Sequence, residues 1–143
     1  MKKAPISKWI FLIYLLLMVW LLLGERLLAP FPSGGQNLIP FSTIASQLAL
    51  LKRGRYYLRF AMVNLAGNLL MFLPLGYLLP RTFPRFRKFL SFFPLVVLSL
   101  LLVEGIQYIT MLGIADVDDV ILNLFGALMG FGLFKFTSRQ PAT

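Results

Sequence analysis

The segment "GIADVDDVILNLFGALMG", at positions 113–130, places three carboxylates at the start of an apolar run. The carboxylates belong to Asp116, Asp118 and Asp119, and the side-chain amide of Asn123 follows four residues later. Residues three or four positions apart share one face of a helix, so the segment predicts a helix with polar groups on the face of its first turns. An apolar helix that begins with acids raises the question of which side of a membrane its start faces.

The whole chain is too apolar for an ordinary soluble domain. Of its 143 residues, 59% are hydrophobic and 13% are charged, whereas soluble domains contain about 25% charged residues. A helix needs about 20 mostly apolar residues to cross the hydrocarbon core of a bilayer, and four blocks approach that length. They cover residues 9–23, 60–79, 89–112 and 119–136. We therefore expect one all-α integral membrane domain over residues 1–143, with four transmembrane helices.

The sequence contains neither cysteine nor histidine. Disulfides, thiolate metal sites and histidine-based acid–base catalysis are therefore excluded. The net charge is +9. In a membrane protein this excess predicts topology signals and contact with anionic lipid headgroups, and we expect membrane lipids rather than nucleic acid as partners. No cofactor is evident, although carboxylates could hold a divalent cation.

Basic residues predict the orientation of the four spans, because lysine and arginine in short loops stay in the cytoplasm. Nine of them fall at the amino terminus, in the second loop and in the carboxyl tail. They are Lys2, Lys3, Lys8, Arg81, Arg85, Arg87, Lys88, Lys135 and Arg139. The first loop, residues 24–59, carries five, and the third loop carries the acids. We therefore expect both termini on the cytoplasmic side of a bacterial cytoplasmic membrane, with the acidic loop outside.

The spacing of apolar residues in the first loop predicts a short amphipathic helix. Phe41, Ile44, Leu48 and Leu51 recur at helical spacing, and Ser42 is a candidate N-cap. Two placements remain open for this helix. It could lie on the outer surface of the membrane, or it could pack against the bundle as an ordinary connection.

Three pairs of polar residues fall in the outer half of the spans under this orientation. They are Asn64 with Asn68, Glu104 with Gln107, and Asp119 with Asn123. Each pair has helical spacing, and two of the faces continue into small or flexible residues: Gly126 and Gly130 in the fourth span, Gly67 and Met71 in the second. We therefore expect the polar faces also to be the faces along which the helices pack closely.

Glu104 is the most informative single residue. A carboxylate within a span costs at least about 2.5–3.5 kcal/mol, whereas hydrogen bonds between membrane helices average about 0.6 kcal/mol. The structural alternative is a neutral Glu104, or one bonded to Asn64, Asn68 or Gln107. Because such a bond alone does not offset the cost of insertion, the magnitudes favour a functional role.

These polar segments together resemble the VanZ-like family of small bacterial membrane proteins. The resemblance rests on "NLIPF" (37–41), "NLAGNLLMFLPLGYLLP" (64–80), "VEGIQYI" (103–109) and "DVDDVILNLFGALMG" (116–130). It implies a four-span membrane protein linked to glycopeptide resistance, classically resistance to teicoplanin. The positions that match the family's motifs are Asn37, Pro40, Asn64, Gly67, Asn68, Pro74, Gly76, Glu104, Gln107, Asp116, Asp119, Asn123 and Gly126.

One stretch departs from the family's pattern. Relatives often place an arginine just before the acidic run, where this chain has Gly113, Ile114 and Ala115. If that arginine normally pairs with an acid, we expect Arg55 or Arg59 to replace it here. Otherwise the acids could take a cation.

The first functional hypothesis is an outward-facing polar pocket that recognises a lipid-linked or lipophilic ligand of the cell envelope, such as a peptidoglycan precursor or a lipoglycopeptide. Amides and carboxylates hydrogen-bond sugars and peptides, and basic groups contact phosphates. The candidate ligand-binding residues are Asn37, Asn64, Asn68, Glu104, Gln107, Asp116, Asp119 and Asn123. The candidate headgroup contacts are Lys52, Arg53, Arg55 and Arg59.

Two other classes of function stay open. In an enzyme acting on a lipid phosphate or cell-wall precursor, Glu104 would be the candidate catalytic base, and Asp116, Asp118 and Asp119 would hold a divalent metal. No established catalytic motif supports that role. In a transporter, Glu104 would carry a proton or an ion, and four spans would require an oligomer. The three acids also have a plain structural explanation, because carboxylates stabilise helix N-termini.

Overall fold

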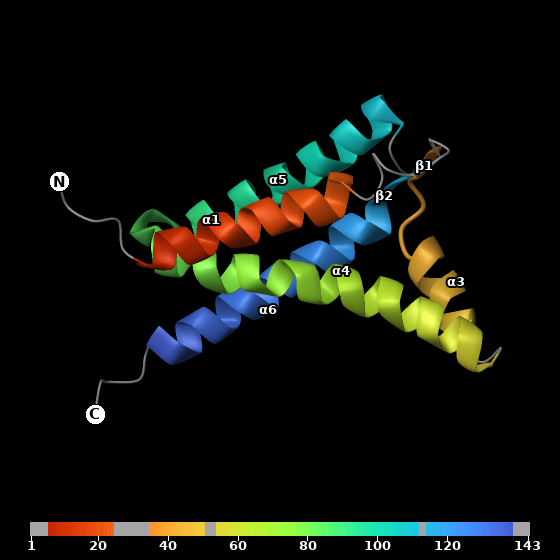
Figure 1. Ribbon diagram of the computed structural model, residues 1–143, viewed down its shortest axis with the longest axis horizontal. Helices are drawn as coiled ribbons and strands as arrows, with labels where there is room; N and C mark the ends of the chain where they lie inside the picture. Colours follow the sequence, from red (N-terminus) through yellow and green to blue (C-terminus); the bar gives the residue numbers. More distant parts are fainter. Residues whose placement is uncertain (1–5, 25–34, 51–53, 112–113, 139–143) are drawn as a thin grey trace.

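The chain folds into long apolar helices (Figure 1). A computed structural model describes residues 6–24, 35–50, 54–111 and 114–138. The first helix, α1 (Ile6–Val19), continues into a π-helical turn over Trp20–Gly24. It is followed by α4 (Arg55–Thr82), α5 (Phe89–Thr110) and α6 (Val117–Ser138). The last three are long and apolar enough to cross a membrane, and α1 is a shorter apolar helix. The expectation of an all-α membrane protein is confirmed.

Helix α4 is longer than the span expected from the sequence. Its 28 residues correspond to about 42 Å at 1.5 Å per residue, more than the roughly 30 Å of a hydrocarbon core. The first turns, with Arg55 and Arg59, are exposed. Pro74 and Pro80 lie inside the helix, where neighbouring membrane helices allow proline. The start of α4 therefore extends beyond the predicted apolar block.

The closest contact in the bundle joins α4 and α6. A Cβ atom added to Gly126 would lie 2.0 Å from the carbonyl oxygen of Leu69, and one added to Gly130 would lie 2.0 Å from that of Leu73. Both pairs advance in the same direction, so α4 and α6 run parallel. The predicted close packing along Gly126 and Gly130 is confirmed, because a side chain at either position would separate the two backbones.

The corresponding prediction for α4 is wrong. A Cβ atom on Gly67 would meet nothing within 4 Å, whereas one on Gly76 would lie 1.9 Å from the carbonyl oxygen of Ala127. The face of α4 that meets α6 therefore contains Gly76. The face with Gly67, one turn after Asn64 and beside Asn68, points elsewhere.

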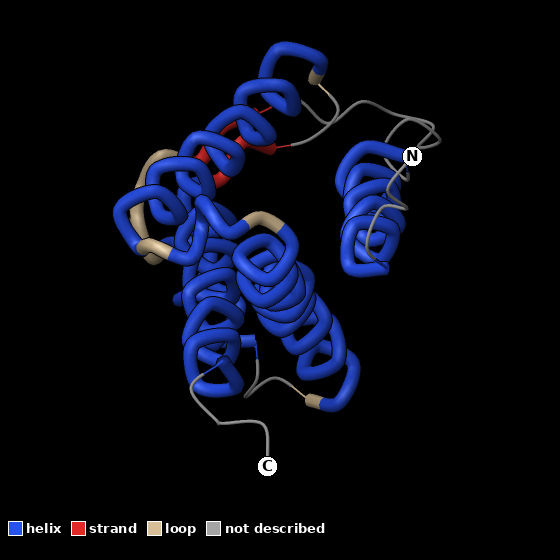
Figure 2. The backbone as a smooth tube through the Cα atoms, turned by 90° about the vertical axis from the view of Figure 1, so that its left-hand side faces the viewer, coloured by secondary structure: helices blue, strands red, loops and turns tan. Residues whose placement is uncertain are grey.

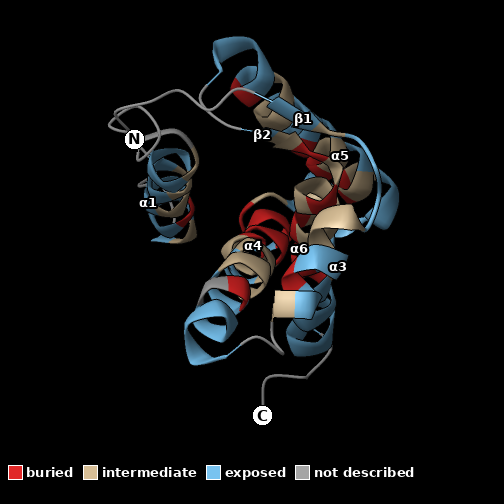
Figure 3. Cartoon of the chain, turned by 90° about the vertical axis from the view of Figure 1, so that its right-hand side faces the viewer, coloured by how far each residue is buried: buried red, intermediate tan, exposed pale blue. Residues whose placement is uncertain are grey.

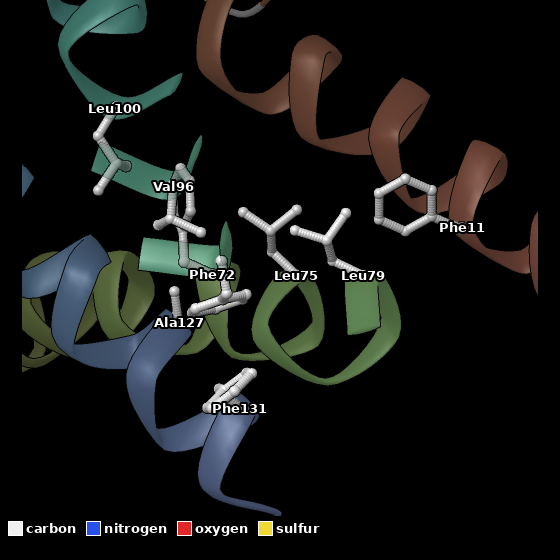
Figure 4. Packing of buried hydrophobic residues seen from close by; sticks show 9 residues of the cluster. Phe11, Phe72, Leu75, Leu79, Val96, Leu100, Ala127 and Phe131 are labelled. Atoms are coloured by element: carbon white, nitrogen blue, oxygen red, sulfur yellow. The ribbon is translucent and has the colours of Figure 1, made fainter. Parts of the chain in front are cut away.

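The hydrophobic core lies between α4, α5 and α6 (Figures 3 and 4). It consists of Phe11, Phe72, Leu75, Leu79, Phe92, Val96, Leu100, Ala127 and Phe131. The rings of Phe92 and Phe131 stack with their centroids 4.4 Å apart. Helix α1 contributes Phe11 alone to the buried cluster, and most of its other side chains are exposed. Such an apolar surface on a membrane protein suits contact with lipid.

Two short strands and one short helix close one end of the bundle. Strand β1 (Gly35–Asn37) pairs in parallel with β2 (Ile114–Asp116), and Asn37 lies opposite Asp116. Figure 2 shows the two strands in red beside the helices. Helix α3 (Ser42–Leu50) follows β1 and contacts α4 and α6. Helix α1 begins, and α6 ends, at the opposite end of the molecule (Figure 1).

Helix α3 confirms the short helix of the first loop and corrects its orientation. The helix contacts α4 and α6, and its placement on the membrane surface stays a prediction. Gln47 is buried, whereas Phe41 and Leu48 expose 61% and 48% of their surface. Phe41 and Leu48 of the predicted apolar stripe therefore face away from the bundle, whereas Ile44 is half-buried. Leu51 lies outside the described residues.

Candidate functional site

The acids at the start of α6 bind the start of α3. The Asp118 carboxylate is fully buried and accepts hydrogen bonds from the backbone N–H groups of Phe41, Thr43 (2.8 Å) and Ile44 (3.1 Å). The first N–H groups of a helix lack partners within the helix, and a negative charge there is also favoured by the helix dipole. Asp118 therefore supplies the cap that the sequence analysis assigned to Ser42, and that assignment is wrong.

Asp116 caps α6 and joins three segments of the chain. Its carboxylate accepts hydrogen bonds from the N–H of Asp118 (2.9 Å), the hydroxyl of Thr43 (2.6 Å) and the amide of Asn37 (3.1 Å). Its own N–H donates to Oε2 of Glu104 at 2.9 Å. We call Asn37, Thr43, Glu104, Asp116 and Asp118 the acidic latch. It fastens β1 and α3 to α5 and α6.

The latch gives the acids a structural role. Glu104 accepts a hydrogen bond from the backbone N–H of Asp116, a partner that the structural alternative of Asn64, Asn68 or Gln107 did not include. Within the described part of the chain, no group of three or more acidic, histidine or cysteine side chains is arranged to hold a metal ion. A bound divalent cation and a catalytic role for Glu104 stay predictions. The latch does not require either, because its carboxylates already accept hydrogen bonds from N–H and O–H donors.

Three other predicted site residues, Asn68, Gln107 and Asn123, do not belong to the latch. Asn68 donates from its amide nitrogen to Oδ1 of Asp119 in a short hydrogen bond that joins α4 to α6. Gln107 is buried and donates to the carbonyl oxygen of Leu22 at 3.4 Å, in the π-helical end of the first helix. Asn123 is also buried, and its Oδ1 has no hydrogen-bond partner among the described residues. These contacts involve residues of α1, α4, α5 and α6, and the single polar pocket stays a prediction.

Asn64 lies in a groove between α1 and α4. The cavity there has a volume of about 550 Å³. It is lined by Tyr14, Leu17, Met18, Leu21, Val63, Asn64, Gly67, Asn68, Leu70, Met71 and Pro74. The Tyr14 hydroxyl donates to the carbonyl oxygen of Met71 at 2.8 Å and lies 3.1 Å from the sulfur of Met18. We call this cavity the α1–α4 groove. It combines an apolar wall with two side-chain amides.

The sequence analysis missed the part of α1 in this groove. Tyr14 is a polar residue in the otherwise apolar run of α1, and that was the available signal. A tyrosine within a membrane helix usually finds a partner for its hydroxyl, as Tyr14 does on α4. Thr43 was missed as a latch residue because a threonine in a short helix has no distinguishing pattern.

Arg55 and Arg59, the basic residues of the first loop that the structure describes, are not among the hydrogen-bond partners of Asp116 and Asp118. Figure 1 shows α3 starting beside the strands and ending beside the start of α4. Arg55 begins α4, so it is separated from the latch by the length of α3, about 13 Å at 1.5 Å per residue. Asp116 and Asp118 bind N–H and O–H donors instead of Arg55 or Arg59. Lys52 and Arg53 lie outside the described residues.

Comparisons with known proteins agree with the motifs found in the sequence. The VanZ/LLP1 family profile matches residues 10–138. A similar relative is "Protein VanZ" of Enterococcus faecium, which is 27% identical over 140 residues, covering 94% of this chain and 77% of the relative. No solved structure matches the chain. The family match includes the acidic latch and the α1–α4 groove, and this chain belongs to the VanZ/LLP1 family of membrane proteins.

Proposed function

We propose that this protein binds a lipophilic or lipid-linked ligand of the cell envelope in the α1–α4 groove, and that this binding contributes to glycopeptide resistance of the teicoplanin type. The observation that carries the proposal is the groove itself: about 550 Å³ of space, apolar along its length, with Asn64 and Asn68 in its wall. Small-molecule sites typically have volumes of about 300–1,000 Å³ and combine an apolar lining with a few polar groups.

The exposure of the lining supports a ligand that enters from the bilayer. Leu17, Val63 and Leu70 line the groove and expose 54%, 69% and 59% of their surface. In a membrane such side chains meet hydrocarbon rather than water. A ligand with an apolar chain reaches these residues without leaving the lipid phase, whereas a water-soluble ligand does not.

The arrangement of charge supports an outward-facing latch. Basic side chains gather near the end of the bundle where α1 begins and α6 ends: Lys8, Arg81, Arg85, Arg87, Lys88 and Lys135. The latch lies at the other end. The positive-inside rule then orients both termini to the cytoplasm and the latch to the outside, as expected from the sequence. Asn64 and Asn68 fall in the half of α4 nearer the outer surface.

Native mass spectrometry of the full chain in mild detergent tests the proposal. Leu70→Trp places a larger ring in the groove, and Leu98→Trp makes the same change at an exposed position of α5 that does not line it. We expect the wild type and Leu98→Trp to retain a lipophilic molecule that Leu70→Trp loses. Cells that express Leu70→Trp should also lose protection against teicoplanin. Equal retention by all three proteins, or retention by none, would contradict the proposal.

A further inference from the structure

A short apolar turn is exposed where β1 leads into α3. Leu38, Ile39 and Phe41 expose 67%, 69% and 61% of their surface, and Pro40 between them is exposed as well. We call residues 38–41 the apolar tip. Single exposed apolar residues are common on proteins, whereas a contiguous exposed group marks contact with a membrane or with a partner.

The backbone of the apolar tip is held by residues of the acidic latch. The N–H of Ile39 donates to Oδ1 of Asn37 at 3.3 Å, and the N–H of Phe41 donates to the carboxylate of Asp118. The N–H of Ser42 donates to the carbonyl oxygen of Ile39 at 3.3 Å. The turn therefore has a fixed backbone, although its apolar side chains lie outside the bundle.

Phe41 adopts an unfavourable backbone conformation within the tip. Its φ is 66°, in the left-handed region, where a bulky residue is uncommon. Such a conformation persists only where the surrounding structure fixes it, and strained residues cluster at functional positions. Glycine would adopt the same φ without strain. The backbone therefore does not require a phenylalanine here, and the exposed ring has to be explained by what it contacts outside the bundle.

The apolar tip lies at the height of the membrane boundary. Helices α5 and α6 have 22 residues each, about 33 Å at 1.5 Å per residue, close to the roughly 30 Å of a hydrocarbon core. The end of α5 and the start of α6 therefore lie near one surface of the bilayer. The tip is beside that start, because the N–H of Phe41 bonds Asp118, the second residue of α6. Figure 1 shows β1 and the start of α3 at this end of the bundle.

We propose that the apolar tip inserts into the membrane leaflet nearest the latch, and that the latch holds the tip in the conformation that inserts. The proposal does not depend on the ligand of the α1–α4 groove. Interfacial helices bury their apolar faces about 5–10 Å into the boundary between headgroups and acyl chains. We assign a similar depth to the tip, whose fixed turn loses little conformational freedom on insertion.

The surroundings of the tip favour lipid as its occupant over a partner protein. Exposed apolar residues also occur at the end of α5, at Ile109 and Met111, and in β2, at Ile114. Strand β2 contacts both α5 and β1, so the tip adjoins an end of the bundle that is apolar on its surface. The carboxylates of Asp116 and Asp118 do not oppose insertion, because both are buried and accept hydrogen bonds.

The depth of a probe at Ile39 tests the proposal. The sequence contains no cysteine, so Ile39→Cys can carry a single environment-sensitive fluorophore on the full chain. The vesicles are made of phosphatidylcholine and phosphatidylglycerol, with or without a lipid that carries a spin-label quencher near its headgroup. We expect blue-shifted emission that the lipid quencher reduces and aqueous iodide does not. Ser46→Cys, at an exposed polar position of α3, is the matched control and should respond to iodide.

Two outcomes of this measurement would overturn the proposal. If iodide rather than the lipid quencher reduces the emission at Ile39, the tip lies in water. If neither quencher reaches the probe, the tip is covered by protein, from a second copy of the chain or from a partner.

Phe41→Gly separates insertion from folding. Because glycine relieves the strain at φ 66°, thermal stability in detergent should not fall, whereas loss of the ring should reduce lipid quenching of the probe at Ile39. Met111→Gly is the matched control, because Met111 is also exposed and has a φ of 54°; it should leave the quenching unchanged. A fall in stability for Phe41→Gly with unchanged quenching would assign the ring to the fold and overturn its role in insertion.

Discussion

The acidic latch and the α1–α4 groove are two polar regions of one bundle, and they differ in how far their polar side chains are hydrogen-bonded within the protein. In the latch, carboxylates such as Asp118 meet several backbone or hydroxyl donors and are buried. In the groove, Asn64 has no side-chain partner among the described residues, and part of the surrounding lining, such as Leu17 and Val63, is exposed. A polar group that the fold satisfies stabilises the fold, whereas one left without a partner is available to a ligand.

Charge alone would suggest that the acids bind a ligand and that the asparagines are structural, and the hydrogen bonds indicate the reverse. Acids in a membrane protein attract attention as functional groups, yet here they hold the N-termini of α3 and α6. The neutral asparagine attracts less attention, because an amide costs less to bury, and it is this residue that lies open to the groove. Five substitutions test the difference between the two regions, and they are ordered here by their expected effect on stability.

The largest loss is expected for Asp118→Ala in the latch. The change leaves three backbone N–H groups at the start of α3 without their acceptor, so the free energy of unfolding should fall by about 3 kcal/mol. Thermal unfolding in detergent measures the loss, and hydrogen exchange should show faster exchange at Thr43 and Ile44. Asp118→Asn, which keeps one carbonyl oxygen, should lose less. An unchanged melting temperature with protected α3 amides would mean that Asp118 is not the cap.

A smaller loss is expected for Gly126→Ala in the contact that supports both regions. The new methyl group would meet the carbonyl oxygen of Leu69 at 2.0 Å, and overpacking of this kind costs about 1–3 kcal/mol. Gly132→Ala on the same helix is the matched control, because its Cβ atom would meet nothing within 4 Å. The two melting temperatures should differ clearly, and equal values would contradict the close contact of α4 with α6.

Much of the fold could be predicted from the sequence, because apolar runs predict the helices and small residues predict where two helices pack closely. The four apolar blocks become α1, α4, α5 and α6, and Gly126 and Gly130 do form a close contact. These features are local to a segment. A run of apolar residues long enough to cross a bilayer has few alternatives to a helix, since each backbone group must be bonded within the membrane.

The partners of the polar residues could not be predicted in the same way. Asp118 binds backbone N–H groups more than 70 residues away, and a backbone group carries no sequence signal. The face of α4 was also assigned incorrectly at Gly67, because lipid-facing and core-facing surfaces are both apolar in a membrane protein. Hydrophobic patterning therefore locates the helices in the sequence but does not show which face of each helix packs against its neighbours. The α1–α4 groove depends on those faces, so it could not be predicted.

A third substitution removes a single bond from the latch. In Thr43→Val the hydroxyl that donates to Asp116 at 2.6 Å is lost while the shape is kept, and the expected cost is about 1.5 kcal/mol for a bond to a charged group. Ser46→Ala is the control on the same helix, since the Ser46 hydroxyl bonds the carbonyl oxygen of Thr43 and is exposed. Chemical unfolding of the two variants should rank Ser46→Ala as the more stable. The reverse order would remove Thr43 from the latch.

The smallest effect, and the sharpest contrast, is expected for Asn64→Leu and Asn68→Leu. The two residues have the same type and lie one turn apart on α4, but Asn68 is bonded to Asp119 and Asn64 has no described partner. Asn68→Leu should lower stability by about 1 kcal/mol, within the range measured for hydrogen bonds between membrane helices. Asn64→Leu should change it by less than about 0.5 kcal/mol.

Thermal unfolding of the ligand-stripped proteins measures this pair without interference from a bound molecule. If the two variants lose equal stability, then Asn64 takes part in the internal hydrogen bonding of the bundle and the groove has no amide to offer. If Asn64→Leu is as stable as the wild type, the fold does not depend on a hydrogen bond of the Asn64 amide. That amide is then available to a ligand in the groove.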